Sequence, residues 1–319
     1  MVDEIKLRKQ IIHKAFKKIR GKKYSCFYPG CCKKAIGSHS QSKSSSLKSI
    51  EENGLVISLH YNAFANGPAP EWKPIGINKV SKFPGFCATH DDELFKEVDS
   101  IRETNISSKP LTYLAFRTFA MEMRKKEFEA DKIDLIHKYF KKMNCNLPDI
   151  SNGTLDGLKN CLKVTKPFYL NYFGDLLTSS IEPGMAHKIF KLNENIGVSC
   201  STFINPVPIL KQPLDKPQPI IAFNILPRKN YSLVTFSCVK KDHSLLDMFI
   251  ENNGRIEDLV FNFCEEITLN PTFFNSITPL SHEAITRAIL PWNSWDKIII
   301  PELFNMKLKN SQFWELMNA

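Results

Sequence analysis

Cys26-Phe-Tyr-Pro-Gly-Cys31-Cys32 and Cys87-Ala-Thr-His90 are the two stretches that decide the fold of the N-terminal part of this 319-residue chain. They form two short-spaced ligand pairs, and together they offer three thiolates and one imidazole. Zn²⁺ prefers this donor set in a closed tetrahedral site, where the ion organises the fold and performs no chemistry. We therefore predict a structural Zn²⁺ bound by Cys26, Cys31, Cys87 and His90.

The local sequence around both pairs predicts a treble-clef zinc lobe. Pro29-Gly30 predicts a tight turn that brings the first two thiolates together. Apolar residues recur at helical spacing from Asp91 onward, so the second pair is expected at or just before the first turn of a helix. A cysteine knuckle followed by a helix start is the outline of a treble clef. A short strand through residues 35–36 is expected to carry His39 at its end.

Burial of unrelated cysteines is the alternative explanation for these clusters. Cys32 directly follows Cys31, so its thiolate cannot easily point at the same ion, and it is either a substitute ligand or a packed neighbour. The other cysteines lie in apolar or helical contexts and are expected to fill the core: Cys145, Cys161, Cys200, Cys238 and Cys264. Nine cysteines without a secretory leader indicate a reducing compartment, so we expect a cytoplasmic protein.

Positive charge is concentrated in the first fifty residues. They contain 13 Lys or Arg against two acidic residues, Asp3 and Glu4, whereas the rest of the chain is close to neutral. Concentrated positive charge favours a polyanionic partner, because each neutralised phosphate releases condensed counterions. We expect this region to bind nucleic acid, with DNA favoured over RNA; a solvated helix face that only aids solubility is the alternative. No apolar run approaches the roughly 20 residues of a membrane helix, so no membrane partner is expected.

The hydrophobic pattern predicts an α+β protein in three parts. Residues 1–105 are expected to hold a basic helix and the zinc lobe, residues 106–195 a helical middle, and residues 196–319 an antiparallel sheet with helices. Helical spacing predicts helices over 3–20, 111–143 (two helices or one broken helix), 155–162, 185–193, 244–252, 255–266 and 312–317. Runs of β-branched and aromatic residues predict strands over 55–60, 75–80, 198–204, 220–225 and 231–239. The Ser-rich segment 38–49 is a flexible linker or a short helix, and its ending favours the helix.

The chain resembles the zinc-containing HNH, or ββα-metal, nucleases over roughly residues 24–100. It shares with them a cysteine pair, a strand bearing a histidine, a variable insertion and a second ligand pair at a helix start. The resemblance implies that His39 is the general base that activates water, and that Asp91 helps to bind a catalytic Mg²⁺ or Mn²⁺. The chain also resembles uncharacterised bacterial zinc-finger proteins that have the same Ser-His and Phe-Cys-x-x-His-Asp arrangement.

Three departures separate the chain from the HNH family. Ser38 stands where an acidic metal ligand usually precedes the histidine, His90 replaces a cysteine, and the insertion between the ligand pairs is long. The resemblance implies a nucleic-acid-processing endonuclease that hydrolyses phosphodiester bonds, and bacterial defence is a context that suits such an enzyme. The alternative, which Ser38 favours, is a non-catalytic zinc-finger adaptor for nucleic acid or protein. The C-terminal domain is expected to select the target or to bind a protein partner.

Overall fold

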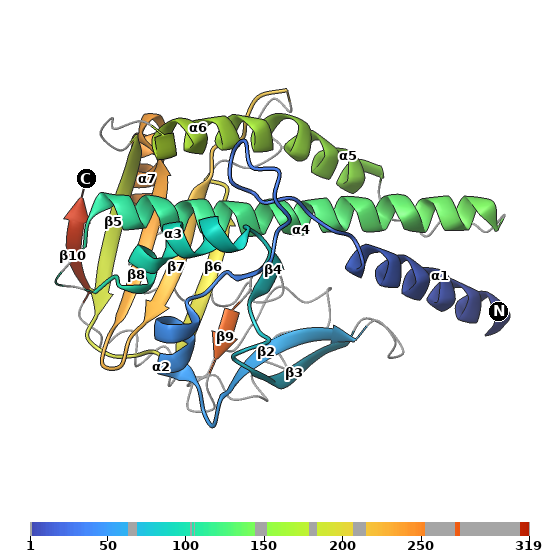
Figure 1. The fold of residues 1–319 in the computed structure, drawn as a ribbon, viewed down its shortest axis with the longest axis horizontal. Helices are drawn as coiled ribbons and strands as arrows, with labels where there is room; N and C mark the ends of the chain where they lie inside the picture. Colours follow the sequence, from blue (N-terminus) through green and yellow to red (C-terminus); the bar gives the residue numbers. More distant parts are fainter. Residues whose placement is uncertain are drawn as a thin grey trace.

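The chain folds as a mixed α and β protein, as the sequence predicts. The computed structural model describes residues 2–62, 69–102, 104, 106–143, 152–178, 184–206, 215–252, 272–274 and 313–318. An antiparallel sheet packs against a long central helix, and the lobe that contains both ligand pairs lies beside that helix (Figure 1).

The N-terminal lobe combines two short strands with one helix. β1 (Gly37–His39) pairs with β4 (Lys82–Pro84), and α3 (Ala88–Asp99) follows. A knuckle precedes β1, in which the N–H of Cys26 donates to the carbonyl oxygen of Lys33 at 2.7 Å. Knuckle, strand pair and helix follow the treble-clef outline that the sequence predicts.

The large sheet contains strands from both the lobe and the C-terminal part of the chain. Its order is β10, β5, β8, β7, β6, β9, β2 and β3, and neighbouring strands are antiparallel. The strands are β2 (Leu55–Asn62), β3 (Ala69–Gly76), β5 (Met185–Leu192), β6 (Val198–Ile204), β7 (Ile221–Pro227), β8 (Ser232–Val239), β9 (Thr272–Phe274) and β10 (Phe313–Asn318). β2 and β3 belong to the insertion between the ligand pairs, so this insertion extends the C-terminal sheet.

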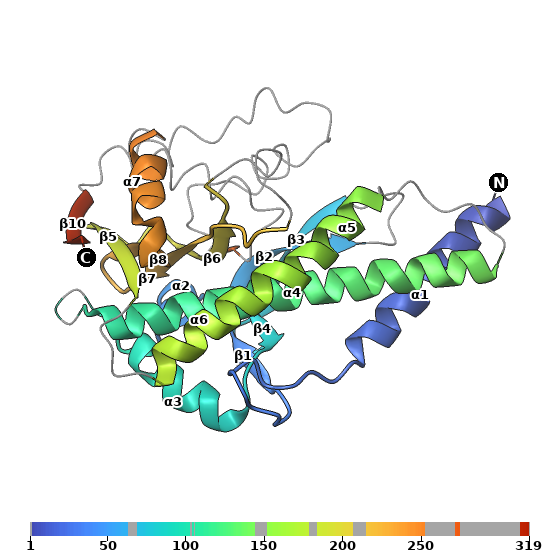
Figure 2. The ribbon, with the colours of Figure 1, turned by 90° about the horizontal axis from the view of Figure 1, so that it is seen from above.

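The central helix α4 (Ser108–Lys142) joins the lobe to the sheet. It is a continuous helix of 35 residues, whereas the sequence favours two helices or a broken one. Its N-terminal half packs on one face of the sheet, and α7 (His243–Asn252) packs on the opposite face through Leu246 (Figure 2). Across the described residues, no helix combines the length and the apolar character that crossing a membrane demands.

The basic helix α1 (Val2–Arg20) lies along the distal half of α4. Ile11 and Ala15 of α1 pack against Ile136 and Phe140 of α4, which buries the apolar stripe that the sequence predicts. The two helices project together from the body of the molecule (Figure 1). After α4 the chain forms α5 (Asn152–Asn160), the π-helical turn η2 (Cys161–Thr165) and α6 (Lys166–Thr178) before it enters β5.

Two helices predicted from the sequence are wrong. Residues 185–193 read as a helix, but they form β5, which is paired on both edges with β8 and β10. Residues 312–317 also read as a helix, and the structure places β10 there. Hydrogen bonds to strands distant in the sequence outweigh local helix propensity in both segments.

The other predicted strands and helices differ in outcome from one part of the chain to the next. Residues 198–204, 220–225 and 231–239 form β6, β7 and β8, whereas the strand predicted over 75–80 lies earlier, in β3. The Ser-rich segment forms a π-helical turn, η1 (Lys43–Leu47), and the short helix α2 (Lys48–Ile50), which favours the helical interpretation. The helix predicted over 255–266 lies outside the described residues, as do Cys145 and Cys264. The three domain boundaries stay a prediction.

Candidate metal centre

Four side chains converge beside the start of α3. One ligand atom from each of Cys26, Cys31, Cys87 and His90 lies within 4.8 Å of the other three. Nδ1 of His90 is 3.4 Å from Sγ of Cys26 and 3.5 Å from Sγ of Cys87. Ligand atoms around a tetrahedral ion with bonds of about 2.0–2.3 Å are separated by roughly 3.5 Å. The cluster is therefore the right size to hold a metal ion, and it contains the four residues that the sequence predicts.

The knuckle and the first turn of α3 position these ligands. Gly30 has a φ of +75°, a left-handed conformation that glycine adopts without strain, and it closes the knuckle turn. Cys87 directly precedes the first turn of α3, and His90 lies within it. The backbone N–H groups of Cys87 and Tyr28 lie 3.2 and 3.5 Å from the sulfur of Cys26. These donors stabilise negative charge on that sulfur.

The thiols of Cys26 and Cys87 are buried but differ in acidity. Burial raises the pKa of the Cys26 thiol to about 11. Burial also opposes ionisation of Cys87, but hydrogen bonds from the His90 backbone and from the neighbouring thiols outweigh it and lower the pKa of Cys87. A bound cation would compensate negative charge on both sulfurs.

The other cysteines lie outside this cluster. Cys32 is exposed on the knuckle and does not belong to the group of converging ligands. Cys200 and Cys238 are buried in the sheet, which confirms that they fill the core, and Cys161 is partly buried against it.

Tight packing behind the centre fixes the shape of the lobe. The ring of Tyr28 stacks on the ring of His90, with 3.9 Å between their centroids. At Gly85, a Cβ atom would lie 2.7 Å from the ring of Phe83 and 2.9 Å from the Cβ of Ser38. The chain between β4 and the second ligand pair therefore has room only for glycine at this position.

Two buried arginines, Arg124 and Arg228, fasten the lobe to the rest of the molecule. Arg124 of α4 donates through Nε to the carbonyl oxygen of Pro84 at 2.8 Å and through Nη2 to the carbonyl oxygen of Ser25. Its Nη1 donates to Glu127 at 2.5 Å, so the charge is compensated. Arg228, which follows β7, donates through Nε and Nη2 to the carbonyl oxygen of Ile101 at 3.2 and 3.1 Å. These side chains hold both ends of the lobe against α4 and the sheet.

His39 lies at the end of β1, as the sequence predicts, opposite Lys82 of β4. Its Nδ1 is 3.0 Å from Oγ of Ser81, and Ser81 has a φ of +59°, which is strained for a residue other than glycine. Burial lowers the pKa of His39, and the positive charges of Lys82 and Lys43 lower it further. The imidazole is therefore largely neutral near pH 7.

Asp91 lies in the first turn of α3, where burial raises the pKa of its carboxyl group and the nearby Ser38 hydroxyl partly offsets this effect. Ser38 is fully buried, and its Oγ accepts the N–H of Phe86 at 2.9 Å. Successive side chains of a strand point to opposite faces, so Ser38 points toward Asp91 while His39 points toward Ser81. The described contacts therefore bring Asp91 to Ser38 and not to His39. The catalytic roles of His39 and Asp91 stay predictions.

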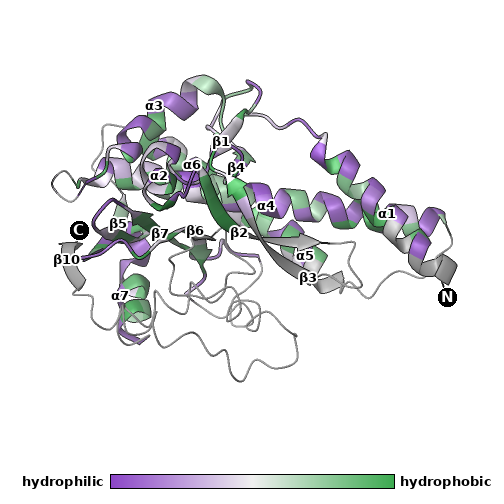
Figure 3. Cartoon of the chain, turned by 90° about the horizontal axis from the view of Figure 1, so that it is seen from below, coloured by the Kyte–Doolittle hydropathy of each residue, from purple (hydrophilic) through white to green (hydrophobic). Residues whose placement is uncertain are grey.

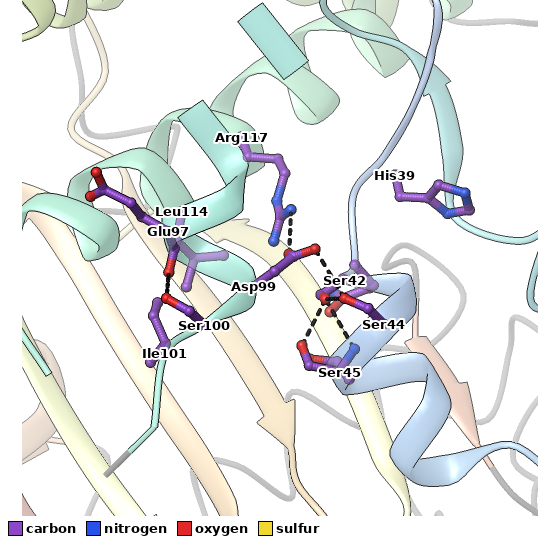
Figure 4. Close-up of polar contacts among 12 residues, drawn as sticks. His39, Ser42, Ser44, Ser45, Glu97, Asp99, Ser100, Ile101, Leu114 and Arg117 are labelled. Atoms are coloured by element: carbon purple, nitrogen blue, oxygen red, sulfur yellow. Dashed lines mark hydrogen bonds and ion pairs between the residues drawn. The ribbon is translucent and has the colours of Figure 1, made fainter. Parts of the chain in front are cut away.

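Sequence reasoning missed a polar cluster around the buried Arg117 of α4. Arg117 of α4 lies 3.5 Å from Asp99 of α3, and Asp99 accepts a hydrogen bond from Ser44 at 3.2 Å (Figure 4). Ser42 also accepts the backbone N–H of Ser45 at 3.2 Å and begins η1. One signal was available in the sequence, because an arginine interrupts the apolar run from residue 111 to 121.

Comparison of the chain with protein-family models, with curated proteins and with solved structures finds no match in any of the three. The resemblance to HNH nucleases therefore stays a prediction from the sequence. Function is inferred from the geometry of the four ligands and from the charges around them.

Proposed function

We propose that this protein is a zinc-stabilised nucleic-acid-binding protein in which the metal shapes a basic lobe. The observation that carries the proposal is the convergence of Cys26, Cys31, Cys87 and His90. Three thiolates and one imidazole are ligands that Zn²⁺ prefers, whereas hard cations such as Mg²⁺ and Ca²⁺ prefer oxygen ligands. All four positions are filled by protein ligands, so the ion has a structural role and the function lies on the surface around it.

The surface of the N-terminal part supports a polyanionic partner. Basic side chains are exposed along α1 and the knuckle that follows it: Lys6, Lys14, Lys17, Lys18, Arg20, Lys22, Lys23, Lys33 and Lys34. The end of α4 beside α1 adds Lys138, Lys141 and Lys142. Hydrophilic residues cover much of these two helices (Figure 3). This arrangement suits contact with a phosphate backbone, where binding is electrostatic and independent of base sequence.

Metal analysis of the purified chain tests the zinc centre. We expect about one zinc per chain, because four ligands close one tetrahedral site. Cys87→Ser should lose the ion, whereas Cys32→Ser, which removes the exposed neighbour of the cluster, should keep it. Full zinc content in Cys87→Ser would exclude this ligand set.

Binding measurements on labelled duplex DNA, single-stranded DNA and RNA test the surface. The affinity should fall steeply with salt, since each neutralised phosphate contributes about −0.9 to the logarithmic slope for duplex DNA. Replacing Lys14, Lys17 and Lys18 together by Glu should weaken binding by about tenfold or more. The matched control reverses three exposed lysines outside the basic region, Lys216, Lys229 and Lys240. Equal losses in both variants would argue against a specific basic surface.

Metal-dependent hydrolysis of nucleic acid is the second candidate function. One observation favours it: His39 is half-buried at the end of β1, with a largely neutral imidazole beside Lys82, as a general base requires. Incubation of plasmid and single-stranded DNA with Mg²⁺ or Mn²⁺ tests this candidate. The binding proposal expects no cleavage. Cleavage that His39→Ala abolishes would establish hydrolysis instead, and cleavage that His39→Ala leaves unchanged would remove His39 from the mechanism.

A further inference from the structure

Asp91, Phe95 and Asp99 form a stripe on α3 because they follow one another at intervals of four residues. This stripe faces Arg117 of α4. The guanidinium carbon of Arg117 lies 5.0 Å from the centroid of the Phe95 ring, and its Nη1 lies 3.5 Å from Oδ1 of Asp99. The same guanidinium attracts Asp91 electrostatically. One cation therefore serves two carboxylates of the same helix.

Arg117 is deeply buried, and its surroundings explain why it can be charged there. Its side chain is 4% exposed. Nε and Nη2 of Arg117 and Oδ1 of Asp91 are buried and have no hydrogen-bond partner among the described residues. A buried guanidinium without compensating charge is strongly unfavourable, so the two carboxylates are what allows Arg117 to occupy this position.

The residues around Asp91 do not fit the divalent cation that the HNH resemblance implies. Mg²⁺ requires near-octahedral coordination by hard oxygen ligands, usually with one or two carboxylates. The position before His39 offers only the hydroxyl of the buried Ser38, whose oxygen accepts the N–H of Phe86 at 2.9 Å. His39 itself contacts Ser81. Asp91 is therefore the one carboxylate that the HNH resemblance assigns to the divalent ion. The positive charge of Arg117 acts on Asp91 and would repel a divalent cation bound there.

We infer that Arg117 is the resident cation of this position and supplies to Asp91 and Asp99 the positive charge that a divalent ion supplies in a metal-dependent nuclease. The inference is independent of nucleic-acid binding, so its failure would leave the proposed binding function standing. It also separates the two candidate functions, because hydrolysis of the HNH type needs a divalent ion at Asp91.

Mn²⁺ binding to the zinc-loaded chain, followed by electron paramagnetic resonance, tests the inference. The wild-type protein should bind no Mn²⁺ at this position at millimolar concentration. Arg117→Met removes the charge and keeps most of the side-chain volume, so its dissociation constant for Mn²⁺ should be at least about tenfold below the lower limit found for the wild type. Adding Asp91→Asn to this variant should abolish the gain. A folded Arg117→Met protein that shows no gain would overturn the inference.

If Arg117→Met does not fold, Mn²⁺ binding to the wild-type protein and to Asp91→Asn still tests the inference. Mn²⁺ bound by the wild type and lost in Asp91→Asn would show that Arg117 leaves room for a divalent ion, and the inference would be wrong. Absence of such binding, together with a folded Arg117→Lys variant that also binds no Mn²⁺, would support it, because lysine retains the positive charge.

Discussion

The ring of Tyr28 lies on the ring of His90, with 3.9 Å between their centroids and 19° between their planes. This stacking fixes the orientation of the imidazole, whose Nδ1 faces the sulfur atoms of Cys26 and Cys87. Residues that orient a ligand typically contribute 10–100-fold to metal affinity. Tyr28→Ala should therefore weaken zinc binding by at least about tenfold in competition with a chromophoric chelator. Tyr28→Phe keeps the ring and should bind zinc like the wild type; a loss of equal size in Tyr28→Phe would contradict the stacking role.

Arg124 should contribute strongly to the free energy of unfolding, because its buried side chain connects α4 to the N-terminal lobe. Replacing it by Met removes the donors to Ser25 and Pro84 and leaves the partly buried carboxylate of Glu127 with one of its two cations, Lys166. Breaking a buried pair typically costs about 3–5 kcal/mol, and the remaining lysine reduces this, so we expect a loss of about 3 kcal/mol in the free energy of unfolding. Urea unfolding measures it, with Lys159→Met as the control. Lys159 pairs with Asp134 at the surface, where each side chain is 51% exposed, so its loss should be below about 1 kcal/mol.

Glycine is required at position 85 and replaceable at position 157. Alanine at Gly85 would bring its Cβ to 2.7 Å from the ring of Phe83, so the strand leading to Cys87 must shift. Overpacking of this kind costs about 1–3 kcal/mol, and zinc affinity should fall with it. Gly157 lies in α5 with no atom within 4 Å of the added Cβ, so alanine there should raise stability by about 0.5–1 kcal/mol. Thermal unfolding of both variants measures the contrast, and a stable Gly85→Ala would refute the steric argument.

His187 should make the protein sensitive to mild acid. It is fully buried between α4 and the sheet, with Nδ1 2.8 Å from Oγ of Ser237, and burial lowers its pKa from 6.5 to about 4. The unfolded chain takes up a proton at His187 as the pH falls through 6.5, whereas the folded chain does so only near 4. Stability is therefore complete above pH 6.5 and falls by about 3 kcal/mol by pH 4. Unfolding free energies measured across this range should show the slope, and His187→Gln should flatten it; an unchanged slope would assign the effect to other groups.

The metal ligands could be predicted from the sequence because their chemistry is local. Each ligand pair lies within one turn or one helix start, so spacing alone restricts the geometry. Helix α1 and strands β6 to β8 could be predicted for the same reason, since their periodicity is strong within a short window. The burial of Ser38 could not be predicted, because it depends on Asp91 and Phe86, which lie about fifty residues later.

The rest of the fold depends on contacts that no short window contains. β5 reads as a helix because Met185, Ala186 and Leu192 are helix formers, yet β8 and β10 provide hydrogen bonds on both of its edges. Arg117 is similar, since a charged residue at a core position of α4 makes sense only when Asp99 and Asp91 of α3 are known to face it. Such partners become visible only in three dimensions.

Because the β2–β3 hairpin lies between the two pairs of metal ligands, we expect the metal centre to form before the large sheet is complete. β9 pairs with β2 but follows it by about 200 residues, so this pairing raises the contact order and waits until β9 has left the ribosome. A nascent chain can bring its four ligands together before that, but the edge of β2 that faces away from β3 stays unpaired until β9 is synthesised. In a lobe transplanted into another protein, the edge of β2 that pairs with β9 would stay exposed permanently. The metal centre therefore cannot be transferred as an independent zinc-finger module.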